Sequence, residues 1–286
     1  MTASAEATNR FFGITEKSVV ALPLSVDYIA GKMMVVRALT ASCRLLELPV
    51  SNTVEINEKV NLLSVVPSQL PSLLSNQNSL NNIDNLLIGG APLSISQEEK
   101  LVEKGVKAWL SYGMTETCSH VAIRRVGEDD VFKAMPGISF AVDMRGCLVI
   151  LSENFSWKQI VTNDMVELVD SQSFRWLGRI DNVVNSGGLK LHPEQIERLI
   201  RKSIPDIVPF YLTSEVDEIL GQRLVMVAEG APDGLIDLLR EKINNHRILP
   251  KRIVSAESLP LTSNGKVKRL KPLEIHTGNL PGAEIM

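Results

Sequence analysis

The chain has 286 residues, of which 44% are hydrophobic and 22% are charged, as in an ordinary globular protein of one large or two medium domains. Its formal net charge of −3 at pH 7 provides no positive excess for binding nucleic acid or an anionic membrane. No apolar run approaches the ~20 residues that a membrane-spanning helix needs, and the three cysteines lack the close spacing of a zinc site. We therefore expect a cytoplasmic protein that binds neither nucleic acid nor membranes.

The N-terminal part predicts alternating helices and strands. Ser4 is a possible N-cap for an opening helix that contains Phe11 and Phe12. Mixed apolar segments follow at 19–24 and 30–48. The further elements expected here are a strand at 61–66, a helix at 67–74, a strand at 86–88, a helix at 97–104 and a strand at 108–110.

The C-terminal part begins with segments that read as strands of a second sheet, at 147–151, 159–161 and 165–169. A helix then starts at Pro193. The apolar spacing predicts that this helix buries Ile196, Leu199 and Ile200. A strand at 224–229 and a second helix from Pro232 complete the pattern. We expect a mixed α/β fold with more than one sheet, and a domain boundary near Asp181.

Ser111-Tyr112-Gly113-Met114-Thr115-Glu116-Thr117 is the segment that carries most chemistry. It follows an apolar strand and offers an aromatic face, a flexible glycine, a hydroxyl and a carboxylate. These groups can stack on a base, approach a phosphate and hold a divalent cation. The alternative interpretation is a plain turn after a strand.

This segment resembles the YGxTE motif of the adenylate-forming superfamily, which includes acyl-CoA synthetases, luciferases and adenylation domains. Further segments resemble motifs of the same superfamily, in the same order along the chain. They are Gly89-Gly90-Ala91-Pro92 (the adenine-side loop), Thr162-Asn163-Asp164 (a TGD-like motif), Gly178 to Gly188 (the hinge motif) and Pro260-Leu261-Thr262-Ser263-Asn264-Gly265-Lys266 (the catalytic-lysine motif). The resemblance implies the adenylate-forming fold, with a partial large N-terminal domain over 1–180 and a small mobile α+β domain over 181–286.

The resemblance also implies roles in nucleotide binding. Tyr112 and Gly113 would lie against the adenine and phosphates, and the backbone from Gly89 through Gly90 to Ala91 would line the base. Thr115 would donate its hydroxyl to a phosphate. Glu116 would be the metal ligand, binding a Mg²⁺ that bridges the phosphates of ATP, as suits a hard cation held by oxygens.

The remaining roles fall on the C-terminal motifs. Asp164 and Arg179 would hold the ribose, and Asp181 would be the hinge about which the small domain moves. Ser186-Gly187-Gly188 would approach the pantetheine arm of coenzyme A, since glycines let backbone come close to a ligand. Lys266 would be catalytic, placing a cation where charge develops on the attacking carboxylate and α-phosphate.

The sequence contains no glycine-rich phosphate loop. Residues 1–13 resemble the helix that follows this loop in related ligases. We therefore expect the chain to start just downstream of it, as a fragment or a shortened gene product. Such a loop supplies N–H donors to the β- and γ-phosphates of ATP, and no other segment of the sequence obviously replaces them.

The segment from Ile180 to Glu197, with Ser119 and His120 after the YGxTE-like motif, resembles o-succinylbenzoate–CoA ligases of menaquinone biosynthesis. Their acid has two carboxylates, so its pocket needs a donor for the one that does not react. The candidates are Arg37, His120 and Arg124.

The resulting prediction is an acid–CoA ligase that takes a small carboxylic acid, ATP, Mg²⁺ and coenzyme A. One alternative is a ligase for another aryl or fatty acid. The other alternative, from a different class, is a non-catalytic remnant that binds an acyl-adenylate or coenzyme A. The oligomeric state is not indicated.

Overall fold

The computed structural model describes residues 1–128, 130–261 and 267–276. The chain divides into two compact units. The first unit comprises Met1–Thr162 and Val166–Trp176, and the second comprises Asn163–Met165 and Leu177–Met286. The hinge at Asp181 stays a prediction.

An eleven-stranded mixed sheet runs through the first unit in the order β2-β1-β3-β4-β5-β6-β7-β11-β10-β9-β8. Strands β2 to β5 of this order are parallel, and the pairs β5–β6, β6–β7, β7–β11 and β8–β9 are antiparallel. The bounds are β1 Val19–Leu22, β2 Arg44–Glu47, β3 Leu62–Val65, β4 Leu86–Ile88, β5 Ala108–Gly113, β6 His120–Arg125, β7 Val131–Ala134, β8 Ile138–Val142, β9 Cys147–Ser152, β10 Gln159–Asp170 and β11 Ser173–Arg179.

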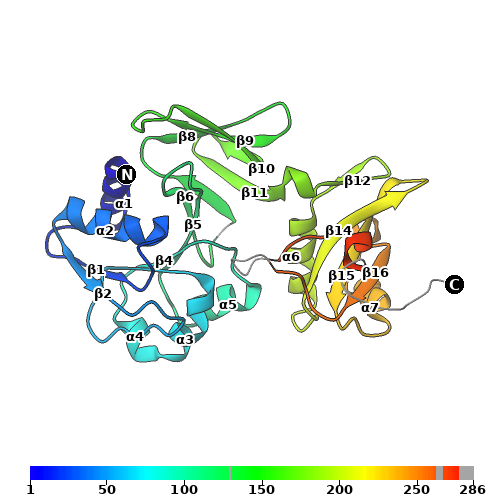
Figure 1. The fold of residues 1–286 in the computed structure, drawn as a ribbon, viewed down its shortest axis with the longest axis horizontal. Coiled ribbons are helices and arrows are strands. Elements are labelled where there is room, and N and C mark those ends of the chain that lie inside the picture. Colours follow the sequence, from blue (N-terminus) through cyan, green and yellow to red (C-terminus); the bar gives the residue numbers. More distant parts are fainter. Residues whose placement is uncertain (129, 262–266, 277–286) are drawn as a thin grey trace. The chain divides into compact units, whose positions relative to one another are not determined.

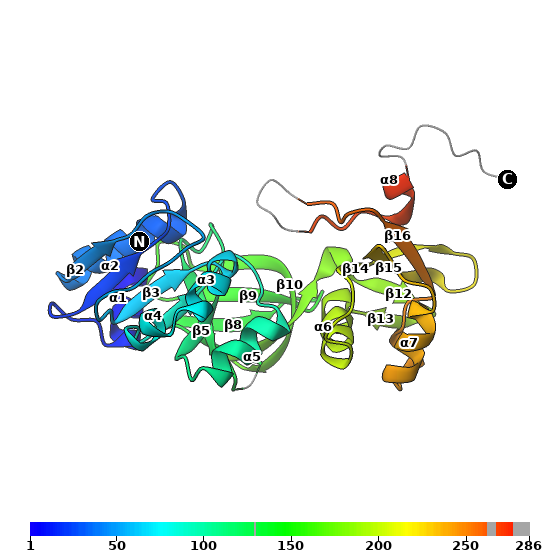
Figure 2. The ribbon, with the colours of Figure 1, turned by 90° about the horizontal axis from the view of Figure 1, so that it is seen from below.

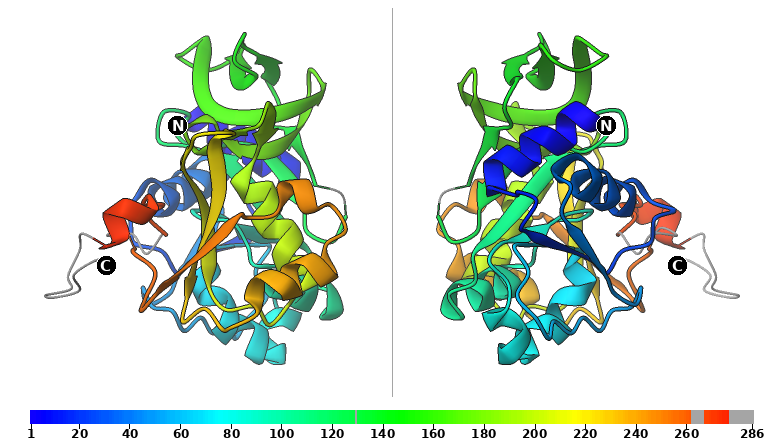
Figure 3. Two further views of the ribbon diagram at one scale, coloured as in Figure 1. Left: turned by 90° about the vertical axis from the view of Figure 1, so that its right-hand side faces the viewer. Right: turned by 90° about the vertical axis from the view of Figure 1, so that its left-hand side faces the viewer.

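Helices lie on both sides of the parallel strands (Figure 1; Figure 3, right). The chain passes from β1 to β2 in one direction and from β3 through β4 to β5 in the other. Right-handed crossovers therefore place the connecting helices on opposite faces. The helices are α1 Thr2–Phe12, α2 Ile29–Ala41, η1 Pro67–Gln69, α3 Leu70–Ser75, α4 Gln77–Asn81 and α5 Ile95–Glu103.

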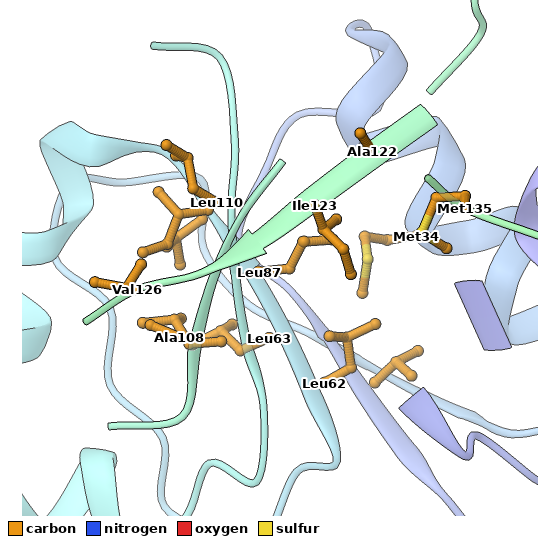
Figure 4. Close-up of a cluster of buried hydrophobic side chains, with 14 of the residues drawn as sticks. Met34, Leu62, Leu63, Leu87, Ala108, Leu110, Ala122, Ile123, Val126 and Met135 are labelled. Carbon is orange, nitrogen blue, oxygen red and sulfur yellow. The ribbon is translucent and has the colours of Figure 1, made fainter. Parts of the chain in front are cut away.

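The main core fills the space between this sheet and its helices. Every residue of β3 and β4 is buried, as expected for parallel strands covered on both faces. Met34 of α2, Leu62 and Leu63 of β3 and Ile123 of β6 belong to the same buried cluster (Figure 4). The core thus fixes α2 and β6 against the parallel strands, and both elements contribute to the site described below.

The second unit is a smaller α+β layer. Its sheet has the order β13-β12-β15-β14, with β16 parallel to β15. Helices α6 and α7 lie on one face of this sheet and α8 on the other (Figure 2). Since alternate residues of β15 point to opposite faces, this strand contributes apolar side chains to both sides. Leu224 and Met226 of β15 belong to the buried cluster under α6 and α7, and Val225 and Val227 belong to the cluster on the opposite face, under α8. The bounds are η2 Ile180–Asn182, β12 Val184–Ser186, β13 Leu189–Leu191, α6 Pro193–Ser203, β14 Phe210–Asp217, β15 Gly221–Glu229, α7 Leu235–Lys242, η3 His246–Ile248, β16 Arg252–Ala256 and α8 Pro272–His276.

The predicted α/β fold with mixed sheets is confirmed, but several local predictions were wrong. Ser4 is not an N-cap: it lies buried inside α1, which begins at Thr2. The segments at 159–161 and 165–169 form one strand, β10, and with 147–151 they belong to the large sheet. Leu199 is 39% exposed, since only the i and i+4 positions Ile196 and Ile200 face the sheet.

Candidate functional site

The Gly89-Gly90-Ala91 segment and the Tyr112–Glu116 segment meet at the carboxyl ends of parallel strands. The first follows β4 directly and the second spans the end of β5, which continues to Gly113 rather than stopping at Leu110 as predicted. Ile88 pairs with Leu110 in the ladder, and the hydroxyl of Ser111 donates to the carbonyl of Ile88 at 3.0 Å. Open α/β sheets bind ligands at this edge.

Gly113 allows two backbone segments to touch. A Cβ added here would clash with the carbonyl of Ser119 and with the Cα of His120, the residue with which Gly113 pairs across β5 and β6. A methyl group at this position would therefore force β5 and β6 apart. The glycine is required by close packing, not by a positive φ.

Thr117 holds the loop that carries Thr115 and Glu116. Its buried hydroxyl oxygen accepts from the N–H of Met114 at 2.9 Å and lies 2.7 Å from the carbonyl of Ser119, to which it can donate. Thr115 and Glu116 themselves are exposed. The loop is thus fixed from inside while a hydroxyl and a carboxylate face solvent, where they can reach a ligand.

Tyr112 is half-buried beside an aromatic cluster. Its ring centroid lies 5.1 Å from that of Phe174 and 5.8 Å from that of Phe132. These contacts fix the plane of the phenol ring. A ring held in this way is suited to stack on a planar base.

A buried polar cluster lies next to Gly113, between α1, α2 and the start of β6. Arg37, which is 2% exposed, donates from Nη2 to the Oγ of Ser119 at 2.9 Å and from Nη1 to the sulfur of Met34 at 3.2 Å. Nη2 also lies 3.5 Å from Nδ1 of His120. Nε of Arg37 is buried and has no hydrogen-bond partner among the described residues.

The charge of Arg37 lacks a counter-ion among residues 1–128, 130–261 and 267–276. Burial lowers the pKa of its guanidinium to about 10, so the group remains charged at neutral pH. An uncompensated buried charge is costly. An anionic ligand that reached Arg37 would remove this cost.

Arg124, the other candidate arginine, is also buried but is paired. It forms ion pairs with Glu98 and, at 3.8 Å, with Asp130. These carboxylates already satisfy the guanidinium. Arg124 is therefore a poorer receptor for a substrate carboxylate than Arg37.

His120 is neutral, and its contacts fix its tautomer. Thr8 donates its hydroxyl to the carbonyl of Ser4 at 2.9 Å, so its oxygen is the acceptor for Nε2–H of His120 at 3.3 Å. Nδ1 is then left as the acceptor that faces Arg37 and Ser119. Burial, together with the charge of Arg37, lowers the pKa of His120 to about 3.

The second unit brings together Asp164 and Arg179. Nη1 of Arg179 lies 3.8 Å from Oδ1 of Asp164, which is 7% exposed, and Nη2 lies 3.4 Å from Oδ2 of Asp181. The two residues predicted to hold the ribose are thus neighbours, and the predicted hinge residue contacts one of them.

Gly187 and Gly188 form the turn between β12, which ends at Ser186, and β13. Gly187 and Gly188 have φ values of +55° and +81°, a region that residues with a Cβ rarely adopt. The N–H of Gly187 donates to the carbonyl of Leu220 at 2.9 Å. Lys266, the predicted catalytic lysine, lies outside the described residues.

Comparison with known proteins identifies the family. The model of the family described as AMP-binding enzyme matches residues 1–147, more than half of the chain. The chain belongs to the AMP-binding enzyme family.

Curated relatives of this chain include 2-succinylbenzoate–CoA ligases. The protein from Salmonella typhimurium is 27% identical over 253 residues, covering 81% of this chain and 54% of that protein. The one from Staphylococcus aureus strain MRSA252 is 26% identical over 286 residues, covering 87% and 57%. The chain thus spans about half the length of the curated relatives it matches.

Solved structures agree on the fold. An acyl-CoA synthetase (AMP-forming)/AMP-acid ligase II-like protein from Dyadobacter fermentans is 30% identical with a TM-score of 0.62, covering 96% of this chain and 82% of that chain. The o-succinylbenzoate coenzyme A synthetase from Bacillus subtilis, in complex with ATP and magnesium ion, is 20% identical with a TM-score of 0.75, covering 93% and 63%. The predicted adenylate-forming fold is confirmed.

In the part of the chain that the structure describes, no group of three His, Cys, Asp or Glu side chains gathers to form a preformed metal site. Glu116 is exposed, and one carboxylate suits a Mg²⁺ whose other ligands are phosphates and water. Likewise, no helix in the described part is long and apolar enough to cross a membrane.

Sequence reasoning missed Thr8, Thr117 and the contact of Ser119 with Arg37. Thr8 and His120 are separated by 112 positions and Arg37 and Ser119 by 82. Local spacing carries no signal for such contacts, because the core alone brings α1, α2 and β6 together.

His120 predicts a pH dependence of stability. Its folded pKa of about 3 lies below the ordinary value of 6.5, so between these pH values the unfolded chain binds a proton that the native protein does not. The free energy of unfolding therefore falls as the pH drops from about 6.5 toward about 3, by up to about 1.4 kcal/mol per pH unit from this residue.

Urea unfolding of His120→Gln should show a shallower fall than the wild type. The exposed His246→Gln is the control, and an equal slope in all three proteins would contradict this assignment.

Proposed function

We propose that the protein is an AMP-forming acid–CoA ligase and that its acid is o-succinylbenzoate. An oxygen of the acid's reacting carboxylate attacks the α-phosphorus of ATP, pyrophosphate leaves, and the acyl-adenylate forms. The thiol of coenzyme A then attacks the acyl carbonyl and AMP leaves. Family membership supports this reaction class, and the dicarboxylate-activating relatives support the choice of acid.

The observation that carries the choice of acid is the buried guanidinium of Arg37. It lies with Ser119 and the neutral His120 beside the end of β5. We assign it to the carboxylate that does not react. A charge-assisted contact there compensates the buried charge and selects acids with two anionic groups.

The nucleotide is assigned to the edge of the parallel strands. Tyr112 stacks on adenine beside the Gly89–Ala91 backbone, and Thr115 donates to phosphate. Glu116 binds Mg²⁺, which supplies charge neutralisation on the phosphates when bound. Gly113 keeps this loop close to the cluster of Arg37.

The C-terminal motifs complete the assignment. Asp164 and Arg179 hold the ribose, and the segment from Ser186 through Gly187 to Gly188 approaches the pantetheine arm of coenzyme A. Lys266 neutralises charge as the carboxylate attacks phosphorus. Asp181 is the hinge about which the small domain moves between the two half-reactions.

The test is acyl-CoA formation, detected by mass spectrometry, from this chain with Mg-ATP, coenzyme A and a panel of acids. A product from o-succinylbenzoate but not from 4-oxo-4-phenylbutanoate, which lacks the second carboxylate, is the expected result. A product from simple aryl or fatty acids instead would point to another acid–CoA ligase.

One observation favours a second candidate, a protein that binds an acyl-adenylate or coenzyme A without turnover. The 286 residues contain no glycine-rich phosphate loop, whose N–H groups would bind the β- and γ-phosphates. An acyl-adenylate has neither phosphate. Tight binding of a non-hydrolysable acyl-adenylate analogue, with no product from any acid in the panel, would select this candidate.

A further inference from the structure

Arg124 lies between helix α5 and the strand that carries Tyr112. It pairs with Leu110 across β5 and β6, two positions before Tyr112. Because side chains on one strand alternate and paired residues share a face, Arg124 and Tyr112 project from the same face of the sheet. Arg124 is 4% exposed. Its guanidinium is therefore enclosed next to the edge assigned to the nucleotide.

Glu98 of α5 is the first partner of this guanidinium. Nη2 of Arg124 donates to Oε1 of Glu98, whose side chain is 16% exposed. Leu101 is the one buried residue of α5, whose nine residues are all described. Nε2 of Gln97 adds a contact to the carbonyl of Pro67 at 2.9 Å. Since packing of an apolar face normally fixes a helix, α5 depends strongly on such polar contacts for its position.

The first turn of α5 continues the predicted adenine loop at Gly89–Ala91. Ser94, three residues after Ala91, is the N-cap: its hydroxyl accepts from the N–H of Gln97 at 3.2 Å. The carbonyl of Ser94 accepts from the N–H of Glu98 at 3.0 Å. The ion pair of Glu98 with Arg124 therefore holds the turn in which this loop ends.

Phe132 is the second partner of the guanidinium. Cζ of Arg124 lies 5.8 Å from the centroid of the Phe132 ring, a distance at which a cation is attracted to an aromatic face. The Phe132 ring lies 5.8 Å from the ring of Tyr112 and stacks on that of Phe174 at 5.5 Å. The guanidinium thus supports a ring that Tyr112 contacts.

We propose that Arg124 is a positioning residue for the adenine-binding site. Through Glu98 it fixes the loop that lines the base, and through Phe132 it fixes the ring that stacks on the base. One buried guanidinium therefore sets the distance between two walls of the site. The proposal rests on the proposed function, in which Tyr112 stacks on adenine beside the Gly89–Ala91 backbone.

Titration calorimetry with AMP and with ribose 5-phosphate, which lacks the base, tests this role without any need for turnover. Arg124→Met is expected to bind AMP about tenfold more weakly, within the range of about 5- to 150-fold that one base–aromatic stack represents. Its affinity for ribose 5-phosphate should not change. Arg124→Lys keeps a cation for Glu98 and should recover most of the affinity for AMP.

Leu80→Ala is the control for a loss of stability alone. Leu80 is 6% exposed on α4 and belongs to the main core. Truncation of a buried leucine costs at least as much stability as loss of a partly buried ion pair. Leu80→Ala should nevertheless bind AMP as the wild type does.

Glu98→Gln is a second, milder variant that keeps the shape of the side chain. It should weaken AMP in the same direction as Arg124→Met, and the double variant should be no weaker than Arg124→Met alone, since the two residues act through one contact. Glu99→Gln changes the same charge at an exposed neighbour on α5 and should leave the affinity unchanged.

Equal affinity of Arg124→Met and the wild type for AMP would overturn the positioning role. So would an equal loss in Leu80→Ala, or an equal loss for ribose 5-phosphate, because either would indicate a general effect on the fold. A wild-type chain that binds no AMP would instead refute the nucleotide site of the proposed function, and this role with it.

Discussion

Arg37→Met is expected to stabilise the unliganded protein and to abolish its preference for an acid with two carboxylates. The guanidinium is buried without a counter-ion among the described residues. Replacing a buried charge by an apolar side chain of similar volume is often neutral or stabilising, by about 1–4 kcal/mol. The second carboxylate of o-succinylbenzoate would lose its cationic partner, which costs about 2–5 kcal/mol, or ~30- to ~4,000-fold in affinity.

Two measurements check this result. Urea unfolding compares the free energies of unfolding, and titration calorimetry compares the affinities for o-succinylbenzoate and 4-oxo-4-phenylbutanoate. The variant and the wild type should bind the second acid alike. Arg124→Met is the matched control: because Arg124 is paired with the partly buried Glu98 and the exposed Asp130, its loss removes a counter-ion of Glu98 and should destabilise the protein by about 1–3 kcal/mol. If Arg37→Met destabilises equally and weakens both acids equally, Arg37 has only a structural role.

Lys266→Ala is expected to remove acyl-adenylate formation. A fixed cation placed where charge develops contributes about 100- to 1,000-fold to the rate, and the uncharged methyl group of alanine cannot replace that cation. The measurement is acid-dependent exchange of pyrophosphate into ATP, which reports the first half-reaction alone. Binding of a non-hydrolysable acyl-adenylate analogue should weaken far less than the rate.

Lys268→Ala is the control for this loss. Lys268 is exposed two positions away, so its removal changes the local charge equally but should leave the exchange rate near that of the wild type. Unchanged exchange in Lys266→Ala would refute the role given to the lysine. A wild type that binds the analogue but shows no exchange would favour the non-catalytic candidate.

Local sequence patterns predicted strands β3, β4 and β5 of the parallel sheet, whereas β1 and β2 lie in segments that the sequence analysis described only as mixed apolar. The strand at 86–88 and the glycines after it are where periodicity and turn chemistry place them. Both signals depend on neighbouring residues, and they act the same way in any tertiary context. The ordered motifs were also sufficient to identify the adenylate-forming superfamily, which the family match confirms.

Errors arose where one pattern fits several packings. The apolar spacing of α6 includes Leu199, but the sheet covers only the side of the helix that bears Ile196 and Ile200. The strands at 159–161 and 165–169 were separated by polar residues that the structure includes in one long strand. Asp164 is one of them, and its pairing with Arg179 explains how a buried carboxylate is accommodated there.

The sequence by itself located the motifs that carry the predicted nucleotide-binding side chains, because each motif lies within a few residues. Only the tertiary structure decided which of three candidate side chains, Arg37, His120 and Arg124, is suited to receive a second carboxylate. Arg124 is neutralised by Glu98, whereas the side-chain groups that Arg37 meets among the described residues are Ser119, Met34 and a neutral imidazole. Charge balance in a protein interior depends on contacts between distant segments, and these exist only once the core has formed.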